Sequence, residues 1–148
     1  SRPDWRTNAS NVGCQCRRFG FVLLPSSMLS RGINDGHIFN INSMSGHRIT
    51  GMMNFYAATK FAVTALTEGL RRELAVKSRI RVTAISPAMV ETDFVTRALG
   101  DENGKEVIQS VGNLLKTQDI VDALIYALSA PESTQISDIL IRPTGNLL

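Results

Sequence analysis

Three side chains that can move a proton or stabilise charge lie close together in this sequence. Tyr56 and Lys60 are four residues apart, and Ser43 precedes Tyr56 by thirteen residues. On a helix, residues four apart lie on the same face, one turn from each other. An ammonium beside a phenol favours the phenolate and lowers the phenol pKa toward the range of an acid/base catalyst. The pair therefore predicts acid/base chemistry at Tyr56, with Lys60 lowering its pKa.

Taken singly, each of these side chains has a plainer interpretation. A tyrosine and a lysine at this spacing arise by chance in many ordinary domains. Ser43 would then be a turn serine, Tyr56 a packing residue with a hydrated hydroxyl, and Lys60 a solvated surface residue. The catalytic interpretation depends on the elements that flank the motif.

The apolar pattern predicts the elements that position these residues. A buried strand is predicted over 37–43, because its core positions Ile38, Phe39 and Ile41 are apolar. A long helix is predicted over 54–76, and a second strand over 80–86 that Pro87 ends. The apolar residues of the helix recur at steps of three and four, and they are Phe55, Ala58, Ala62, Ala65, Leu66, Gly69, Leu70 and Leu74.

The remainder of the chain continues the alternation of helix and strand. Glycines and polar residues predict a loop at 100–104, followed by a short helix near 105–114. Thr117 is predicted to be the N-cap of a helix over 118–130 with Asp119 in its first turn, and a last strand is predicted over 136–141. This alternation implies right-handed crossovers and a parallel sheet.

Ser43, the Tyr56-x-x-x-Lys60 motif and the Ser-Pro turn at Pro87, in this order, resemble the short-chain dehydrogenase/reductase family, in particular its farnesol-dehydrogenase-like subgroup. The resemblance covers residues 28–148 and is closest over 36–46, 56–74 and 80–92. It implies an α/β fold, the C-terminal part of a Rossmann-type doubly wound parallel sheet with three strands visible. Residues 28–148 would form the catalytic portion of this domain, and residues 1–27 an irregular segment.

The resemblance also implies a catalytic set of Ser43, Tyr56 and Lys60. Tyr56 would be the general acid when a carbonyl is reduced and the general base when an alcohol is oxidised. Lys60 would lower the Tyr56 pKa and hold the ribose of a nicotinamide cofactor. Ser43 would hydrogen-bond the substrate oxygen and stabilise its developing charge.

Further cofactor contacts are implied by the turn after the second strand. Besides Tyr56 and Lys60, the family's cofactor-binding positions match Pro87, Val90 and Thr92, the last two near the nicotinamide amide. The family has glycine after this proline, whereas the chain has Ala88. Alanine has fewer backbone conformations than glycine, so this departure concerns the shape of the turn.

The function implied by the resemblance is an NADP(H)-dependent oxidoreductase of a secondary alcohol or carbonyl on a lipophilic small molecule. NADP is preferred because the subgroup usually uses it, with NAD as the alternative, and the intact parent is expected to be a homo-oligomer. No glycine-rich dinucleotide-binding turn occurs in the 148 residues, so we expect a truncated version lacking that crossover. The alternative is a catalytically inactive fragment or pseudogene-like product that retains only the catalytic motif.

The segment before residue 28 departs most from the family. Where the family carries Asp-Val-Asn-Val-x-Gly, the chain has a run over 13–19 that contains both of its cysteines. One possible set of codons for this run also encodes Asp-Val-Asn-Val-Val-Gly when it is read one base later. We therefore hypothesise that residues 8–26 are a frame-shifted translation, and the alternative is a divergent surface loop.

Composition argues against several classes of function. The net charge is +3, and its basic excess lies before residue 37, so no nucleic-acid-binding face is predicted for the rest. No apolar run approaches the roughly eighteen residues that span a bilayer, and no leader pattern is seen, so a cytoplasmic chain is expected. Cys14 and Cys16 suit neither an ordinary disulfide nor a zinc site, and no metal site is predicted.

Overall fold

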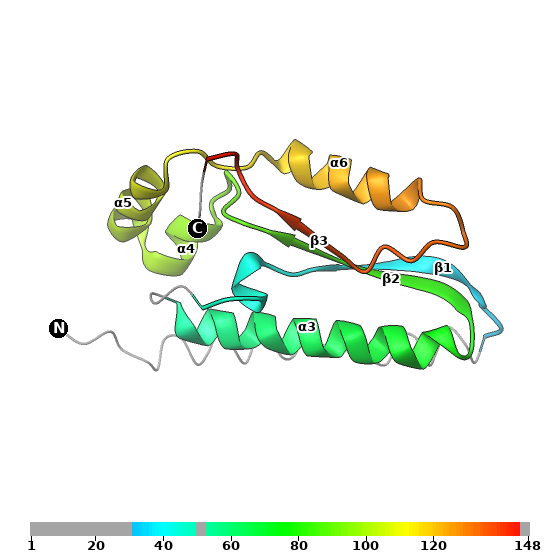
Figure 1. Ribbon diagram of the computed structural model, residues 1–148. Coiled ribbons are helices and arrows are strands. Elements are labelled where there is room, and N and C mark those ends of the chain that lie inside the picture. The colour runs from blue at the N-terminus through cyan, green and yellow to red at the C-terminus, as the bar shows by residue number, and fades with distance from the viewer. Residues whose placement is uncertain (1–30, 50–52, 146–148) are drawn as a thin grey trace.

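The computed structural model describes residues 31–49 and 53–145, which form an open parallel sheet with helices on both of its faces (Figure 1). The three strands are β1 (Asp35–Ile41), β2 (Arg79–Pro87) and β3 (Asp138–Ile141). The helices are the short 3-10 helix η2 (Met44–Gly46), then α3 (Asn54–Ala75), α4 (Phe94–Leu99), α5 (Asp101–Val111) and α6 (Thr117–Leu128). The α/β class and the parallel sheet are as the sequence predicts.

The strand order β1-β2-β3 places the second strand at the centre of the described sheet. In the parallel register, Ile38 lies opposite Val82, and Ile41 lies opposite Ile85. Helix α3 covers one face of the sheet and α6 the other (Figure 1). Because the strands are parallel, the segments that follow β1 and β2 emerge at the same edge of the sheet, where the candidate residues are found.

An apolar cluster anchors α3 to the sheet at the far end from that edge. Leu74 is buried against Ile80 and Val82 of β2, and Leu70 and Ile38 pack around them. Burial of each such side chain contributes about 1.5–3 kcal/mol. This cluster holds the C-terminal half of α3, so other contacts must fix the half that carries Tyr56 and Lys60.

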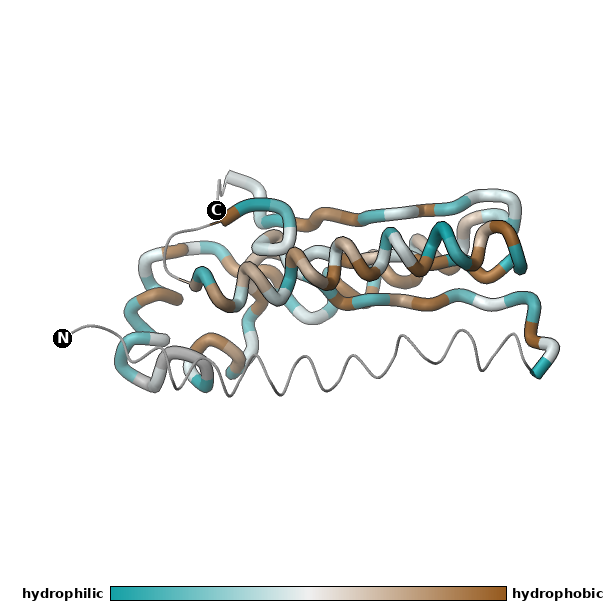
Figure 2. The backbone as a smooth tube through the Cα atoms, turned by 90° about the horizontal axis from the view of Figure 1, so that it is seen from below, coloured by the Kyte–Doolittle hydropathy of each residue, from teal (hydrophilic) through white to brown (hydrophobic). Residues whose placement is uncertain are grey.

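The apolar series that predicts α3 is mostly not the face that packs on the sheet. Phe55 and Leu66 are 48% and 40% exposed, whereas Thr67 is only 2% exposed. The reason is that β1 presents polar side chains, Asn40 among them, to this part of the helix, and threonine hydroxyls pair with them. Apolar and hydrophilic residues consequently alternate along the whole of α3 (Figure 2).

The loop predicted at 100–104 is wrong, because α5 begins at Asp101 and runs through it. Gly100 has a φ of +85° and separates α4 from α5. A Cβ on Gly104 would lie 2.6 Å from the Cα of Thr96. The glycine that suggested a loop instead allows α5 to pack directly against α4.

The start of α6 also differs from the sequence prediction by one residue. Thr117 is the first helical residue, and Lys116 is the N-cap. The carboxylate of Asp119 accepts the backbone N–H of Lys116 at 2.7 Å, so the capping group is the acidic residue of the first turn. The last strand begins later than predicted, at Asp138.

Candidate active site

The structure brings Ser43, Tyr56 and Lys60 together at the carboxyl edge of the sheet. Ser43 follows β1 by two residues, and Tyr56 and Lys60 lie in the first two turns of α3. Ser43 lies close enough to Tyr56 to lower the pKa of its phenol. The ammonium nitrogen of Lys60 lies 5.6 Å from the centroid of the Tyr56 ring. The three side chains therefore share one site.

Ser43 is held by the turn that it begins. It is the N-cap of η2, and its hydroxyl oxygen accepts the backbone N–H of Ser45 at 3.2 Å. Its carbonyl accepts the N–H of Gly46 at 2.9 Å. With the hydroxyl oxygen occupied as an acceptor, the Ser43 proton is available for Tyr56.

The environment of Tyr56 shifts its acidity in the direction opposite to the one expected from Lys60. Burial raises the pKa of Tyr56 above its ordinary value of 10.0, and the hydrogen bond from Ser43 lowers it by less. A buried phenol avoids the charged form because its phenolate would lose hydration. The side chain therefore keeps its proton at neutral pH in the free chain.

Lys60 joins α3 to the end of β1. Its ammonium donates a hydrogen bond to the carbonyl of Ile41 at 3.2 Å. Burial lowers the pKa of Lys60, for the same reason that it raises the pKa of Tyr56. The ammonium is thus held by a backbone acceptor beside the Tyr56 ring.

The turn after β2 is regular although the chain has alanine where the family has glycine. Pro87 is buried at the end of β2. The N–H of Ala88 donates to the carbonyl of Ile141 at 2.8 Å. No non-glycine residue within 31–49 and 53–145 has a positive φ, so Ala88 occupies this position without backbone strain.

Val90 forms a short parallel bridge with Leu115. In this bridge, Leu115 donates to the carbonyl of Met89 at 3.0 Å and accepts from the N–H of Glu91 at 2.8 Å. Since backbone groups alternate in direction along an extended segment, the N–H and C=O of Val90 itself face the other way. The hydroxyl of Thr92 lies 3.5 Å from that carbonyl.

An aromatic residue that the sequence did not single out packs against Tyr56. The ring centroids of Phe94 and Tyr56 are 5.5 Å apart, with the planes inclined at 48°. Phe94 is the first residue of α4 and is 45% exposed. No local sequence pattern links it to Tyr56, because the contact joins two separate helices.

His47 makes a polar contact with the central strand. Its Nε2 lies 2.9 Å from the hydroxyl of Ser86, a fully buried residue of β2. The contact ties the segment after η2 to the central strand. Only the tertiary structure reveals it, since the two residues are far apart in sequence.

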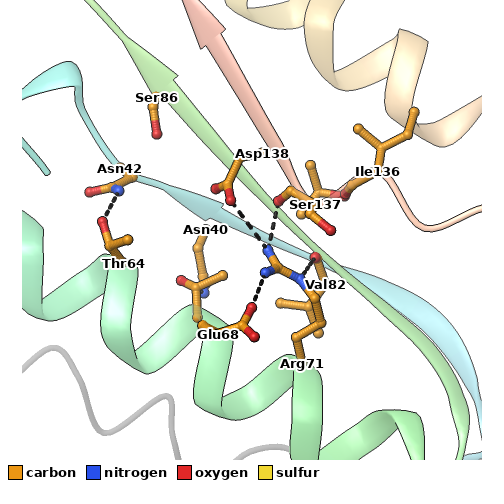
Figure 3. Close-up of polar contacts among 12 residues, drawn as sticks. Asn40, Asn42, Thr64, Glu68, Arg71, Val82, Ser86, Ile136, Ser137 and Asp138 are labelled. Atoms are coloured by element: carbon orange, nitrogen blue, oxygen red, sulfur yellow. Dashed lines mark hydrogen bonds and ion pairs between the residues drawn. The ribbon is translucent and has the colours of Figure 1, made fainter. Parts of the chain in front are cut away.

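Polar contacts continue along the interface between α3 and the strands (Figure 3). The amide of Asn40 donates to Thr67 and that of Asn42 to Thr64, each at 2.9 Å. Further along the helix, Arg71 bonds the backbone carbonyls of Val82 and Ser137. The sequence signal for these residues is their spacing along one face of the helix, which the apolar pattern obscured.

Several expectations concern parts of the chain that the structure does not describe. The irregular segment at 1–27, the segment 8–26 of the frame-shift hypothesis and both cysteines lie outside the described residues.

Across 31–49 and 53–145, no helix has the length and apolar character needed to cross a membrane. In the same ranges, no three His, Cys, Asp or Glu side chains gather in a way that could hold a metal ion.

Sequence comparison places this geometry among known proteins. The profile of the short chain dehydrogenase family matches residues 18–103. The chain is 50% identical over 126 residues to dehydrogenase/reductase SDR family member 11 of Gallus gallus, which covers 82% of this chain and 49% of that protein. It is 39% identical over 122 residues to farnesol dehydrogenase of Aedes aegypti, covering 80% and 46% respectively. The chain spans about half the length of the curated relatives that it matches.

Solved structures show the same fold. The closed form of serine dehydrogenase complexed with NADP+ superposes with a TM-score of 0.68 at 30% identity, covering 95% of this chain and 56% of that one. A mutant 4-hydroxyisoleucine dehydrogenase complexed with NADH and succinate gives a TM-score of 0.59 at 26% identity, covering 82% and 54%. Similar structures are therefore found with either nicotinamide cofactor.

Proposed function

Because this chain belongs to the short-chain dehydrogenase family, we propose that it carries the catalytic residues of an NADP(H)-dependent oxidoreductase. The reaction would interconvert a secondary alcohol and a carbonyl on a lipophilic small molecule. The observation that carries the proposal is the grouping of Tyr56 with Lys60, whose ammonium lies 5.6 Å from the centroid of its ring, and with Ser43, which acts on the same phenol. A hydroxyl pair next to an ammonium is suited to proton transfer at a single substrate oxygen.

In the reductive direction, the bound cofactor would supply the hydride to the carbonyl carbon. Tyr56 would donate its proton to the carbonyl oxygen, and Ser43 would donate a hydrogen bond to the same oxygen as negative charge develops there. The raised pKa of Tyr56 supports this role, since the phenol is protonated before the reaction. In the oxidative direction, the same phenol oxygen would accept the alcohol proton.

Two groups of residues fit a nicotinamide nucleotide by their chemistry. The ammonium of Lys60 and the hydroxyl of Tyr56 are suited to ribose hydroxyls. The N–H and C=O of Val90, both directed away from Leu115, can pair with a carboxamide, which has one donor group and one acceptor. Pro87 and Thr92 would shape the turn around that amide. NADP is preferred over NAD on the resemblance to the farnesol-dehydrogenase-like subgroup.

A lipophilic substrate is supported by the apolar side of the site. Phe94 packs on Tyr56 yet remains 45% exposed, so an apolar ligand placed beside the phenol would cover it. The similarity to farnesol dehydrogenase of Aedes aegypti supports the same class of alcohol. The substrate would then be held by apolar contact at α4 and by its oxygen at Ser43 and Tyr56.

A homo-oligomer is proposed for the intact parent protein. Apolar side chains of α3 that do not pack on the sheet are substantially exposed, with Phe55 at 48%, Phe61 at 41% and Leu66 at 40%. A second copy that covered this face would remove the apolar surface from water.

The proposal is tested by titrating NADPH into the folded chain and following nicotinamide fluorescence, with NADH in a parallel titration. Saturable binding and reduction of a lipophilic ketone would support the proposal although the chain lacks the glycine-rich turn. Tyr56→Phe should lose reduction and bind the nucleotide more weakly, through the remaining contacts, whereas Tyr126→Phe, at a tyrosine that is 65% exposed, should change neither. A chain that unfolds cooperatively but binds neither nucleotide would refute the proposal and favour the inactive-fragment alternative.

A further inference from the structure

Two polar side chains beside the site meet between the end of β1 and α3. Asn42 directly precedes Ser43 in sequence, and Thr64 lies one helical turn after Lys60. The amide nitrogen of Asn42 donates to the hydroxyl oxygen of Thr64 at 2.9 Å (Figure 3). Asn42 is 2% exposed, so this contact is shielded from water.

The Thr64 hydroxyl also connects the helix to the turn that begins at Ser43. Its single proton can be donated to the carbonyl of Gly46 at 2.9 Å or to that of Lys60 at 3.2 Å. Gly46 is the last residue of η2. One hydroxyl therefore links the strand end, the turn and the helical turn that carries Lys60.

The side-chain amide of Asn42 lowers the stability of the fold in one respect. Its Oδ1 is buried and has no hydrogen-bond partner among the described residues. A buried acceptor left unpaired is unfavourable, and an apolar side chain at this position would avoid that cost. What the amide provides is a directed hydrogen bond to Thr64, next to the residue that contacts Tyr56.

From this geometry we propose that Asn42 and Thr64 are positioning residues that hold the Ser43 hydroxyl beside Tyr56. Asn42 fixes the backbone that leads into Ser43, and Thr64 fixes the helix that carries Tyr56 and Lys60. The pair itself touches neither reacting group. The inference rests on the proposed function only for the chemical use of the Ser43–Tyr56 bond.

The test is to break the contact and observe Tyr56 directly. The chain has two tyrosines, so tyrosine labelled with ¹³C at the ring carbon that bears the hydroxyl gives two NMR signals, with Tyr126 as the internal reference. Thr64→Val removes the hydroxyl and nearly keeps the shape. Because Ser43 lowers the Tyr56 pKa, we expect that pKa to rise in Thr64→Val. At neutral pH the ring carbon that bears the hydroxyl should shift as it does in Ser43→Ala.

A double-mutant comparison separates positioning from a general loss of stability. In the Ser43→Ala background, Thr64→Val should add no further change at Tyr56, because the bond it supports is already gone. Thr67→Val is the matched control, since Thr67 makes the equivalent contact with Asn40 one turn along the helix. It should lower stability and leave Tyr56 unchanged, while Thr64→Ser should behave like the unmodified chain.

The proposal is overturned if Thr64→Val folds and leaves the Tyr56 signal and the Tyr56 pKa where Thr67→Val leaves them. Should Thr64→Val fail to fold, Asn42→Ser breaks the same contact from the strand side and is held to the same expectation. These readings require no cofactor or turnover. An inactive chain would therefore contradict the proposed function while still deciding the role of Asn42 and Thr64.

Discussion

Gly46 approaches α3 so closely that a Cβ at this position would stand 2.8 Å from the carbonyl oxygen of Lys60. The same Cβ would lie 2.8 Å from both side-chain polar atoms of Asn42. A helix backbone cannot yield as the end of a flexible side chain can. The turn that begins at Ser43 and the helix that carries Lys60 are thus placed by backbone contact.

Gly46→Ala is therefore expected to force the turn away from the helix. We expect the free energy of unfolding to fall by about 1–3 kcal/mol, as for other overpacked interiors, and carbonyl reduction to fall more than NADPH affinity does. Urea denaturation and NADPH titration measure the two effects. Gly69→Ala is the control, because a Cβ there meets nothing within 4 Å and the change should be neutral or stabilising. Equal losses in the two variants would contradict the close-contact explanation.

Stability should fall at alkaline pH, in part through Tyr56. Its folded-state pKa lies above the ordinary value of 10.0. The contribution is therefore fully present below that value and is lost as the pH rises through the folded-state pKa. Urea denaturation from about pH 8 to about pH 11 should show a shallower decline in Tyr56→Phe than in the unmodified chain.

Two comparisons isolate the effect of Tyr56. Burial lowers the pKa of Lys60, which gives the opposite slope in the same range, and this contribution is present in both chains and cancels. Tyr126→Phe should follow the unmodified chain, since Tyr126 is 65% exposed. Identical slopes for Tyr56→Phe and Tyr126→Phe would show that burial does not perturb Tyr56.

Lys60→Met should weaken nucleotide binding without weakening the fold. The ammonium is partly desolvated and donates to the carbonyl of Ile41, so removing the charge relieves a burial cost as it removes one hydrogen bond. Loss of a charged donor to the ribose should raise the NADPH dissociation constant about 10- to 100-fold. Nicotinamide fluorescence measures this change. A Lys60→Met chain that binds NADPH normally would exclude the ribose contact.

Phe94→Ala should affect the substrate more than the cofactor. The ring packs on Tyr56 at 5.5 Å, and its truncation removes an aromatic contact worth about 0.5–1.5 kcal/mol. We expect the KM for a lipophilic ketone to rise about 3- to 10-fold, with NADPH affinity nearly unchanged. Phe61→Ala, at a phenylalanine of similar exposure on α3, is the matched control. A KM that rises equally in both variants would remove Phe94 from the substrate site.

Arg71→Leu should destabilise the contact between α3 and the sheet. The guanidinium donates to the carbonyls of Ser137 at 2.7 Å and Val82 at 3.2 Å, and the side chain is only 15% exposed. Loss of these charged hydrogen bonds should cost about 2–4 kcal/mol in urea denaturation. Arg72→Leu, at a side chain that is 80% exposed, should change stability by no more than about 0.5 kcal/mol. A smaller loss for Arg71 than for Arg72 would be inconsistent with this role.

The sequence by itself determined the order and type of most elements and the candidate residues. Both long strands and α3 lie within two residues of their predicted positions, because apolar periodicity is a property of contiguous residues. The Tyr56-x-x-x-Lys60 motif is likewise local, and parallel strands carry Ser43 to the same edge. These features depend on spacing, which the sequence contains directly.

Only the tertiary structure decided which polar groups meet and how they are hydrated. The contacts of Asn42 with Thr64 and of His47 with Ser86 join segments that are distant in the chain. The direction of the Tyr56 pKa follows from burial by several elements, which outweighs the influence expected from Lys60. Burial and hydrogen-bond pairing are properties of the packed chain, and the spacing of residues along the sequence does not contain them.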